Sequence, residues 1–168
     1  IINFLNTKMR KEKDLYYPIF DTKTGKCTED TGKWSTQSGS FHCKLALCLC
    51  ELSDIKNDPS YNVKAKRLID SSIINFNIEG RFVTSALNSA SHLHPYSYTL
   101  EGMLYYGYKT KDNSYKDTIE KAFSWVINLQ DKNGGFPTQV FGDKKPDIAH
   151  KRSDIQAQVL RLSYFVRS

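Results

Sequence analysis

Residues 92–101 bring together two imidazoles, two phenols and a carboxylate, and form the most unusual segment of the sequence. Tyr98 and Glu101 are three residues apart, so on a helix they share one face. We interpret Glu101 as a general acid or base and His94 as a second acid–base group. Tyr96 and Tyr98 are then expected to stack on, or hydrogen-bond to, a sugar. The structural alternative is that the tyrosines fill the core and Glu101 pairs with a cation.

A second polar group, Arg152, Asp154 and Gln156, lies where another apolar segment begins. The planar guanidinium of Arg152 is suited to clamping a substrate carboxylate. Asp154 would be the second carboxylate that cleavage of a glycosidic bond usually requires, and Gln156 is expected to bind the substrate. The alternative is local, because Ser153 and Gln156 fit a helix-capping box and the helix dipole favours an anion at Asp154.

A third group of candidate residues lies at the start of the apolar segment at residues 41–52 and in the loop before it. His42 lies at its start and Trp34 in the loop before it, and both are expected to contact substrate, Trp34 as an aromatic platform. Lys44 is unusual on an apolar segment, because a buried lysine is rare unless it is paired. The structural alternative for Lys44 is an ion pair with Glu101 from a neighbouring helix.

The sequence predicts no metal site and no cofactor. Residues 92–94 form a His-x-His pair that could bind a metal ion, but the sequence indicates no third metal ligand near them. The four cysteines form no CxxC pair and are interpreted as small buried residues of a reducing compartment. Sequence motifs of nucleotide-binding proteins, serine hydrolases and zinc proteases are absent.

Two kinds of helical segment are expected to position these groups. Residues 58–76 and 113–130 place apolar side chains at helical spacing, which predicts amphipathic helices, the first with Asp58 as N-cap before Pro59. Residues 41–52, 95–108 and 153–166 are apolar or aromatic on nearly every side, which is typical of buried helices. No segment shows the period-2 alternation of a half-buried strand. The sequence therefore predicts an all-α fold in which apolar inner helices alternate with amphipathic outer ones.

Glycine-containing turns and long loops repeat along the chain. Gly80 and Gly134 each precede an apolar segment, and the loop at residues 136–152 exceeds the roughly 12–15 residues above which irregular connections are usually functional. The long loops are expected at one end of the helical hairpins. A functional site is therefore expected at that end.

Residues 121–136 resemble the QW repeat of terpene cyclases and protein prenyltransferases, in which an outer helix ends in glutamine before a Gly-x-aromatic turn. The wider plan is similar to the α/α toroids, including six-hairpin glycosidases, unsaturated glucuronyl hydrolases and sugar 2-epimerases. The DxDD motif of one cyclase class is absent, and the zinc-binding set of the prenyltransferases cannot be assembled. The resemblance implies an α/α toroid of about three hairpins, which is a partial ring.

The composition is that of one folded domain. Its 168 residues are expected to form a single toroid domain, a fragment of a longer ring that a missing half of the chain or self-association would complete. The net charge is +6, but the basic residues are dispersed, so nucleic acid is not an expected partner. No apolar run is long enough for a membrane helix, and the expected location is cytoplasmic.

The leading hypothesis is a domain that hydrolyses, eliminates or epimerises a small saccharide by carboxylate and histidine chemistry, with an acidic saccharide as one candidate substrate. A second hypothesis is a non-catalytic binding or scaffold part of a ring protein, in which ion pairs with Lys44 and Arg152 engage the carboxylates. A third is an isoprenoid enzyme, which would require an almost wholly aromatic cavity. The sequence leaves open whether the protein is an enzyme.

Overall fold

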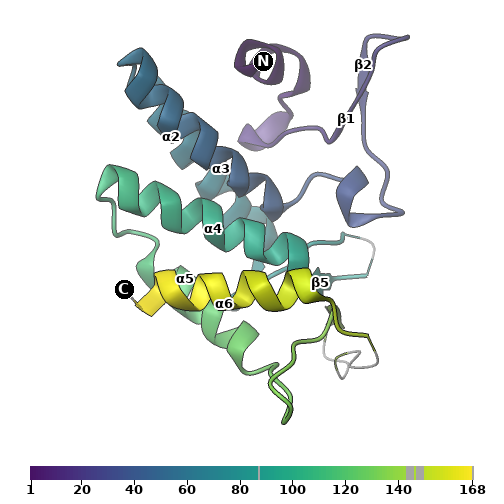
Figure 1. The fold of residues 1–168 in the computed structure, drawn as a ribbon. Coiled ribbons are helices and arrows are strands. Elements are labelled where there is room, and N and C mark those ends of the chain that lie inside the picture. The colour runs from purple at the N-terminus through teal and green to yellow at the C-terminus, as the bar shows by residue number, and fades with distance from the viewer. Residues whose placement is uncertain (87, 143–145, 147–149, 168) are drawn as a thin grey trace.

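The computed structural model describes residues 1–86, 88–142, 146 and 150–167. The chain is mostly helical (Figure 1). Its α-helices are α1 (Ile2–Phe4), α2 (Leu45–Lys56), α3 (Ser60–Phe76), α4 (Leu93–Thr110), α5 (Lys116–Ile127) and α6 (Ser153–Arg167). Short helical turns add η1 (Leu5–Met9), η2 (Glu12–Asp14), η3 (Trp34–Thr36) and η4 (Ser40–Lys44).

The five long helices form two layers. Helices α2, α4 and α6 lie side by side in one layer, and α3 and α5 pack behind them (Figure 1). The three front helices run in the same direction, so that their N-terminal ends, and the loops that precede them, lie at the same end of the layer. The helices occur in the expected order, and the common end of the loops that precede the front helices is confirmed for the described residues. Residues 143–145 and 147–149 of the loop before α6 lie outside the described residues.

Local sequence signals explain the two back helices. Helix α3 begins where predicted, because the Asp58 side-chain oxygen accepts a hydrogen bond from the Ser60 amide at 2.9 Å, as an N-cap does. Its buried side chains include Ala65, Leu68 and Ile69, at the spacing of one helix face. Helix α5 buries Ile119, Ala122, Phe123 and Val126 in the same way.

Helix α4 runs through the centre of the core. Tyr96, Leu100 and Met103 are fully buried there among side chains of α2, α3, α5 and α6. Gly102 allows α4 to pack directly on η4, since a Cβ built on Gly102 would lie 2.0 Å from the carbonyl oxygen of Cys43. This contact sets the position of Glu101, the residue just before Gly102 on α4, relative to Lys44.

The expectation of an all-α fold is confirmed in part. The described residues are mostly helical but include three antiparallel pairs of short strands: β1 (Ile19–Asp21) with β2 (Lys26–Thr28), β3 (Asn77–Ile78) with β4 (Arg81–Phe82), and β5 (Ala90–His92) with β6 (Gln139–Phe141). Each strand has only two or three residues, too few for an alternating pattern to be recognised. The β5–β6 pair joins the segment just before α4 to the loop before α6, and so holds the N-terminal ends of these helices together.

The front helices are buried on one side only, which corrects the expectation that they are enclosed all round. Helix α6 buries Ile155, Val159 and Leu162, but Leu160 and Tyr164 are 75% and 72% exposed. The outward sides of α2 and α4 also carry exposed or half-exposed side chains. Among the described residues, none of the helices combines the length and apolar character needed to cross a membrane.

Candidate functional site

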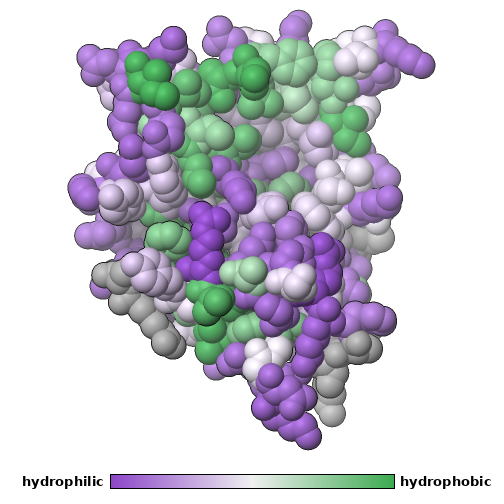
Figure 2. Space-filling model, viewed as in Figure 1, coloured by the Kyte–Doolittle hydropathy of each residue, from purple (hydrophilic) through white to green (hydrophobic). Residues whose placement is uncertain are grey.

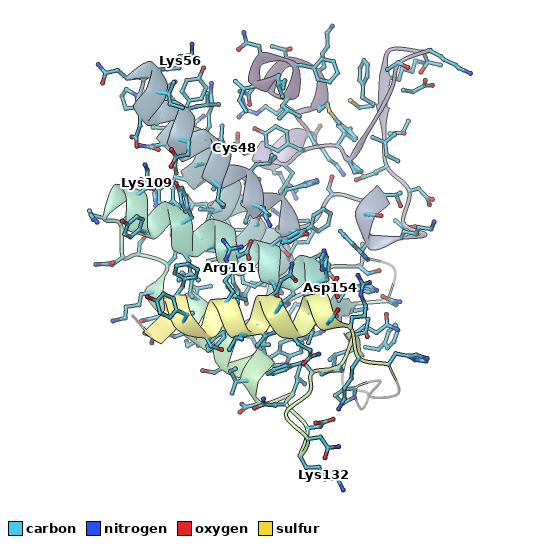
Figure 3. All side chains as sticks on the ribbon, viewed as in Figure 1. Cys48, Lys56, Lys109, Lys132, Asp154 and Arg161 are labelled. Carbon is cyan, nitrogen blue, oxygen red and sulfur yellow. The ribbon has the colours of Figure 1, made fainter. Side chains whose placement is uncertain are left out.

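The side of α2, α4 and α6 that faces away from α3 and α5 carries a row of polar and aromatic side chains on each helix. We call these three rows the open face, because no element covers them in the described part of the chain (Figure 3). Successive residues in each row are three or four positions apart, so they share one side of their helix. The rows are Lys44, Cys48, Glu51 and Ile55 on and before α2; His94, Tyr98, Glu101, Tyr105 and Tyr108 on α4; and Asp154, Gln158, Arg161 and Phe165 on α6.

Glu101 lies in the middle of the open face and is 6% exposed. Its Oε1 is 3.1 Å from Nη1 of Arg161, and its Oε2 is 3.0 Å from Nζ of Lys44. The same Lys44 ammonium lies 3.7 Å from the centre of the Tyr98 ring. The predicted structural alternative for Lys44, an ion pair with Glu101, is therefore confirmed. A general acid must hold a proton on one carboxylate oxygen, and here each oxygen already faces a cation.

A second cluster lies at the N-terminal ends of α4 and α6. Nδ1 of His94 is 3.0 Å from Oδ2 of Asp154, and the Arg152 guanidinium binds both oxygens of that carboxylate, at 3.0 and 2.6 Å. The His94 ring packs against Tyr98 and lies near Trp34, with ring centres 4.8 and 6.1 Å apart. The structure thus brings together five of the side chains that the sequence singled out.

The electrostatics of this cluster give Asp154 a definite role. The hydrogen bonds from Arg152 lower the pKa of the Asp154 carboxyl below its ordinary value. Asp154 is therefore an anion at neutral pH and is unsuited to donating a proton. Its position beside His94 allows it to orient the imidazole and to stabilise the charged ring, as a carboxylate does in many acid–base sites.

The two carboxylates do not form a close pair. His94 and Glu101 are seven residues apart on α4, and their partners Asp154 and Arg161 are seven residues apart on α6. Seven residues correspond to about 10 Å along a helix. Glu101 and Asp154 therefore belong to two clusters, about two helical turns apart along the layer, and their role as a pair of acid–base groups stays a prediction.

Three expected binding residues lie elsewhere. Tyr96 is fully buried, its hydroxyl donates to the Ala122 carbonyl at 3.0 Å, and burial raises the pKa of its phenol. Gln156 binds both the amide and the carbonyl of Phe136, at 3.0 and 3.2 Å, rather than completing a capping box with Ser153. His42 packs against Phe41, and burial lowers the pKa of its imidazole to about 4. Each side chain is engaged in holding the fold.

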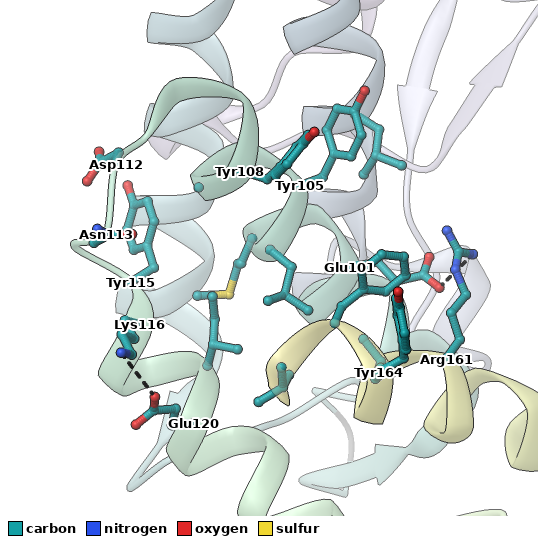
Figure 4. A pocket seen from close by; sticks show the side chains of 18 of the residues that line it. Glu101, Tyr105, Tyr108, Asp112, Asn113, Tyr115, Lys116, Glu120, Arg161 and Tyr164 are labelled. Atoms are coloured by element: carbon teal, nitrogen blue, oxygen red, sulfur yellow. Dashed lines mark hydrogen bonds and ion pairs between the residues drawn. The ribbon is translucent and has the colours of Figure 1, made fainter. Parts of the chain in front are cut away.

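A pocket of about 830 Å³ lies at the other end of the open face, among the C-terminal halves of α4 and α6 and the start of α5 (Figure 4). Aromatic side chains line it, and the Glu101–Arg161 pair lies at its edge. Sequence reasoning missed this pocket and missed Arg161. The available signal was the spacing of Tyr98, Tyr105 and Tyr108, which continues the row of Glu101 along α4.

The surface of the open face is mixed in character. In Figure 2, hydrophilic side chains cross its centre, and hydrophobic ones lie above and below them. Within the described ranges, no three side chains of His, Cys, Asp or Glu come together as metal ligands would. The cysteines found there are free thiols, and burial raises the pKa of Cys43 to about 12.

No family model matches the chain, and no curated protein matches it.

Proposed function

We propose that the chain forms part of an α/α toroid and that its open face binds a saccharide. The parallel arrangement of α2, α4 and α6 in one layer, with α3 and α5 behind, supports this architecture. In such a ring α2, α4 and α6 are the inner helices, and the open face lines the central cavity. Further helices, or a second copy of the chain, complete the ring beyond the edges of the layer.

The chemistry proposed is acid–base catalysis by His94. The observation that carries it is the 3.0 Å contact between Nδ1 of His94 and Oδ2 of Asp154. The Asp154 carboxylate beside Nδ1 favours a proton on that nitrogen, which leaves Nε2 to take or return a proton. Trp34 and Tyr98 flank the ring and provide aromatic surfaces for a sugar. Because Glu101 and Asp154 lie in separate clusters and each faces cations, proton abstraction by His94, as in elimination or epimerisation, fits better than hydrolysis by a pair of carboxyl groups.

The test compares turnover of a panel of neutral and acidic oligosaccharides by the wild type and two matched variants. His94→Gln is expected to lower kcat by about a hundredfold or more, since positioned acid–base groups contribute roughly 10²- to 10⁴-fold. His150→Gln makes the same change at an exposed histidine and is expected to leave kcat unchanged. Unchanged turnover in His94→Gln would refute the catalytic role.

A non-catalytic binding or scaffold role is the second candidate. It is favoured by the ion pairs of Glu101 with Lys44 and Arg161 and of Asp154 with Arg152, which the scaffold hypothesis requires. It predicts saccharide binding without turnover in the same panel. The isoprenoid hypothesis is less well supported, because the pocket lining includes charged side chains beside the aromatic ones.

A further inference from the structure

We propose that Lys44 and Arg161, held in place by Glu101, form a recognition site for the carboxylate of an acidic sugar unit. The inference depends on the proposed saccharide-binding function and names the substrate class. The sequence assigned this role to Arg152, but the fork of Arg152 is engaged with both oxygens of Asp154. The cations that meet at the centre of the open face are Lys44 and Arg161.

The charge balance of this site favours an anion. Two cations share one buried carboxylate, which leaves one positive charge uncompensated within the cluster. In the described part of the chain, neither cation has a second carboxylate partner. The carboxylates nearest along the rows are engaged as well: Glu51 with Tyr105 and Lys109, and Asp154 with Arg152 and His94.

Both cations have donors to spare and are accessible. The side chains of Lys44 and Arg161 are 40% and 56% exposed, whereas that of Glu101 is 5% exposed. An ammonium has three donors and a guanidinium has five, and Glu101 faces one donor group of each. Because Glu101 binds the two cations through different oxygens, it orders them before a ligand arrives, which reduces the entropy lost on binding.

The surroundings favour a sugar acid over a simple anion. The Tyr98 ring lies beneath the Lys44 ammonium, and the Phe165 ring lies 5.8 Å from the Arg161 guanidinium. Tyr105 and Tyr108 continue the same surface into the pocket (Figure 4). A pyranose ring presents C–H groups that pack on aromatic faces, while its carboxylate reaches the cations. The site lies two helical turns from His94, so it would position a saccharide rather than take part in proton transfer.

Isothermal titration calorimetry with trigalacturonate and its methyl ester tests the proposal, because the two ligands differ only in their carboxylate charges. The free acid is expected to bind the wild type at least tenfold more tightly than the ester. Arg161→Gln is expected to weaken binding of the acid by about ten- to a hundredfold, the usual effect of losing a hydrogen bond between charged groups. Lys132→Gln removes the same charge on a distant loop (Figure 3) and is expected to leave the affinity unchanged.

Glu101→Gln gives a result that a merely structural role for Glu101 would not give. It keeps the size of the side chain but removes the charge that holds Lys44 and Arg161 in place, so binding of trigalacturonate is expected to weaken several-fold while binding of the ester stays the same. Circular dichroism of each variant confirms folding. If Arg161→Gln fails to fold, the comparison of acid and ester on the wild type and the Glu101→Gln result still decide the question.

The outcomes separate the two proposals. Equal binding of acid and ester would overturn the carboxylate site and leave saccharide binding intact. Binding of neither ligand, nor of any other oligosaccharide in the panel, would overturn the proposed function and this inference together. Equal affinity for an oligoglutamate peptide would overturn the sugar assignment in favour of an acidic peptide.

Discussion

Gly102→Ala is expected to destabilise the protein by forcing α4 away from η4. The added methyl group would lie 2.0 Å from the Cys43 carbonyl oxygen and 2.9 Å from the Lys44 amide nitrogen. Both are backbone atoms, which cannot move aside by rotating a side chain. The displaced backbone includes Lys44, so the ion pair between Lys44 and Glu101 would be disturbed.

The magnitude follows from two opposing effects. An ordinary van der Waals contact for a Cβ begins at 3.4 Å, so the helix and the turn would have to separate by more than an ångström. Overpacking of a core costs about 1–3 kcal/mol, and a backbone obstacle places Gly102→Ala at the upper end. Alanine recovers about 1 kcal/mol in a helix relative to glycine. The expected net loss in the free energy of unfolding is about 2 kcal/mol.

Urea unfolding followed by circular dichroism measures this loss, and Gly107→Ala is the matched control. The control makes the same change on the same helix, where the new methyl group would meet only the Asp112 carbonyl oxygen, at 3.1 Å. It is expected to be neutral or to stabilise by up to about 1 kcal/mol. If Gly102→Ala proved as stable as Gly107→Ala, the close contact between α4 and η4 would be refuted.

Three further variants test other contacts. Tyr96→Phe removes the hydroxyl bound to the Ala122 carbonyl and should lower the free energy of unfolding by about 1 kcal/mol in a thermal melt, with no change refuting that bond. Gln156→Ala leaves the Phe136 amide and carbonyl unpaired and should lower the free energy of unfolding by about 1–3 kcal/mol in urea. An unchanged free energy would mean that other contacts hold the turn. Burial lowers the pKa of the His42 imidazole from 6.5 to about 4. As the pH falls from 6.5 to 4, the imidazole therefore becomes protonated in the unfolded chain but stays neutral in the folded one. The free energy of unfolding should fall by up to about 3 kcal/mol over this pH range. His42→Phe should lack this pH dependence, and a wild-type slope equal to that of the variant would contradict the burial argument.

The interpretation of Gln156 shows why part of the site could not be predicted. Ser153 and Gln156 have the spacing of a capping box, and a local pattern can predict only local partners. The actual partner of Gln156 is the backbone of Phe136, in the turn that follows α5. Glu101 is partly a similar case: its ion pair with Lys44 of η4 was predicted as an alternative, but its ion pair with Arg161 of α6 was not. Arg161 carries no sequence signal of its own, since it is one basic residue in an amphipathic helix.

The sequence by itself determined the helices and the common end of the long loops. These features depend on apolar spacing and on caps such as Asp58, whose partners lie within a few residues. It also identified five candidate site residues, because each lies beside the start of a front helix or in the loop before one. They are His94, Tyr98, Asp154, Arg152 and Trp34.

Only the tertiary structure decided which side of the front helices is open, how the short strands pair, and what each carboxylate meets. A strand of three residues such as β5 exists because β6, almost 50 residues later, lies beside it. Glu101 became the centre of a cation cluster because Gly102 allows α4 to rest on η4, which brings Lys44 within 3.0 Å. Contacts between distant segments depend on packing, and packing is a property of the whole fold rather than of any local pattern.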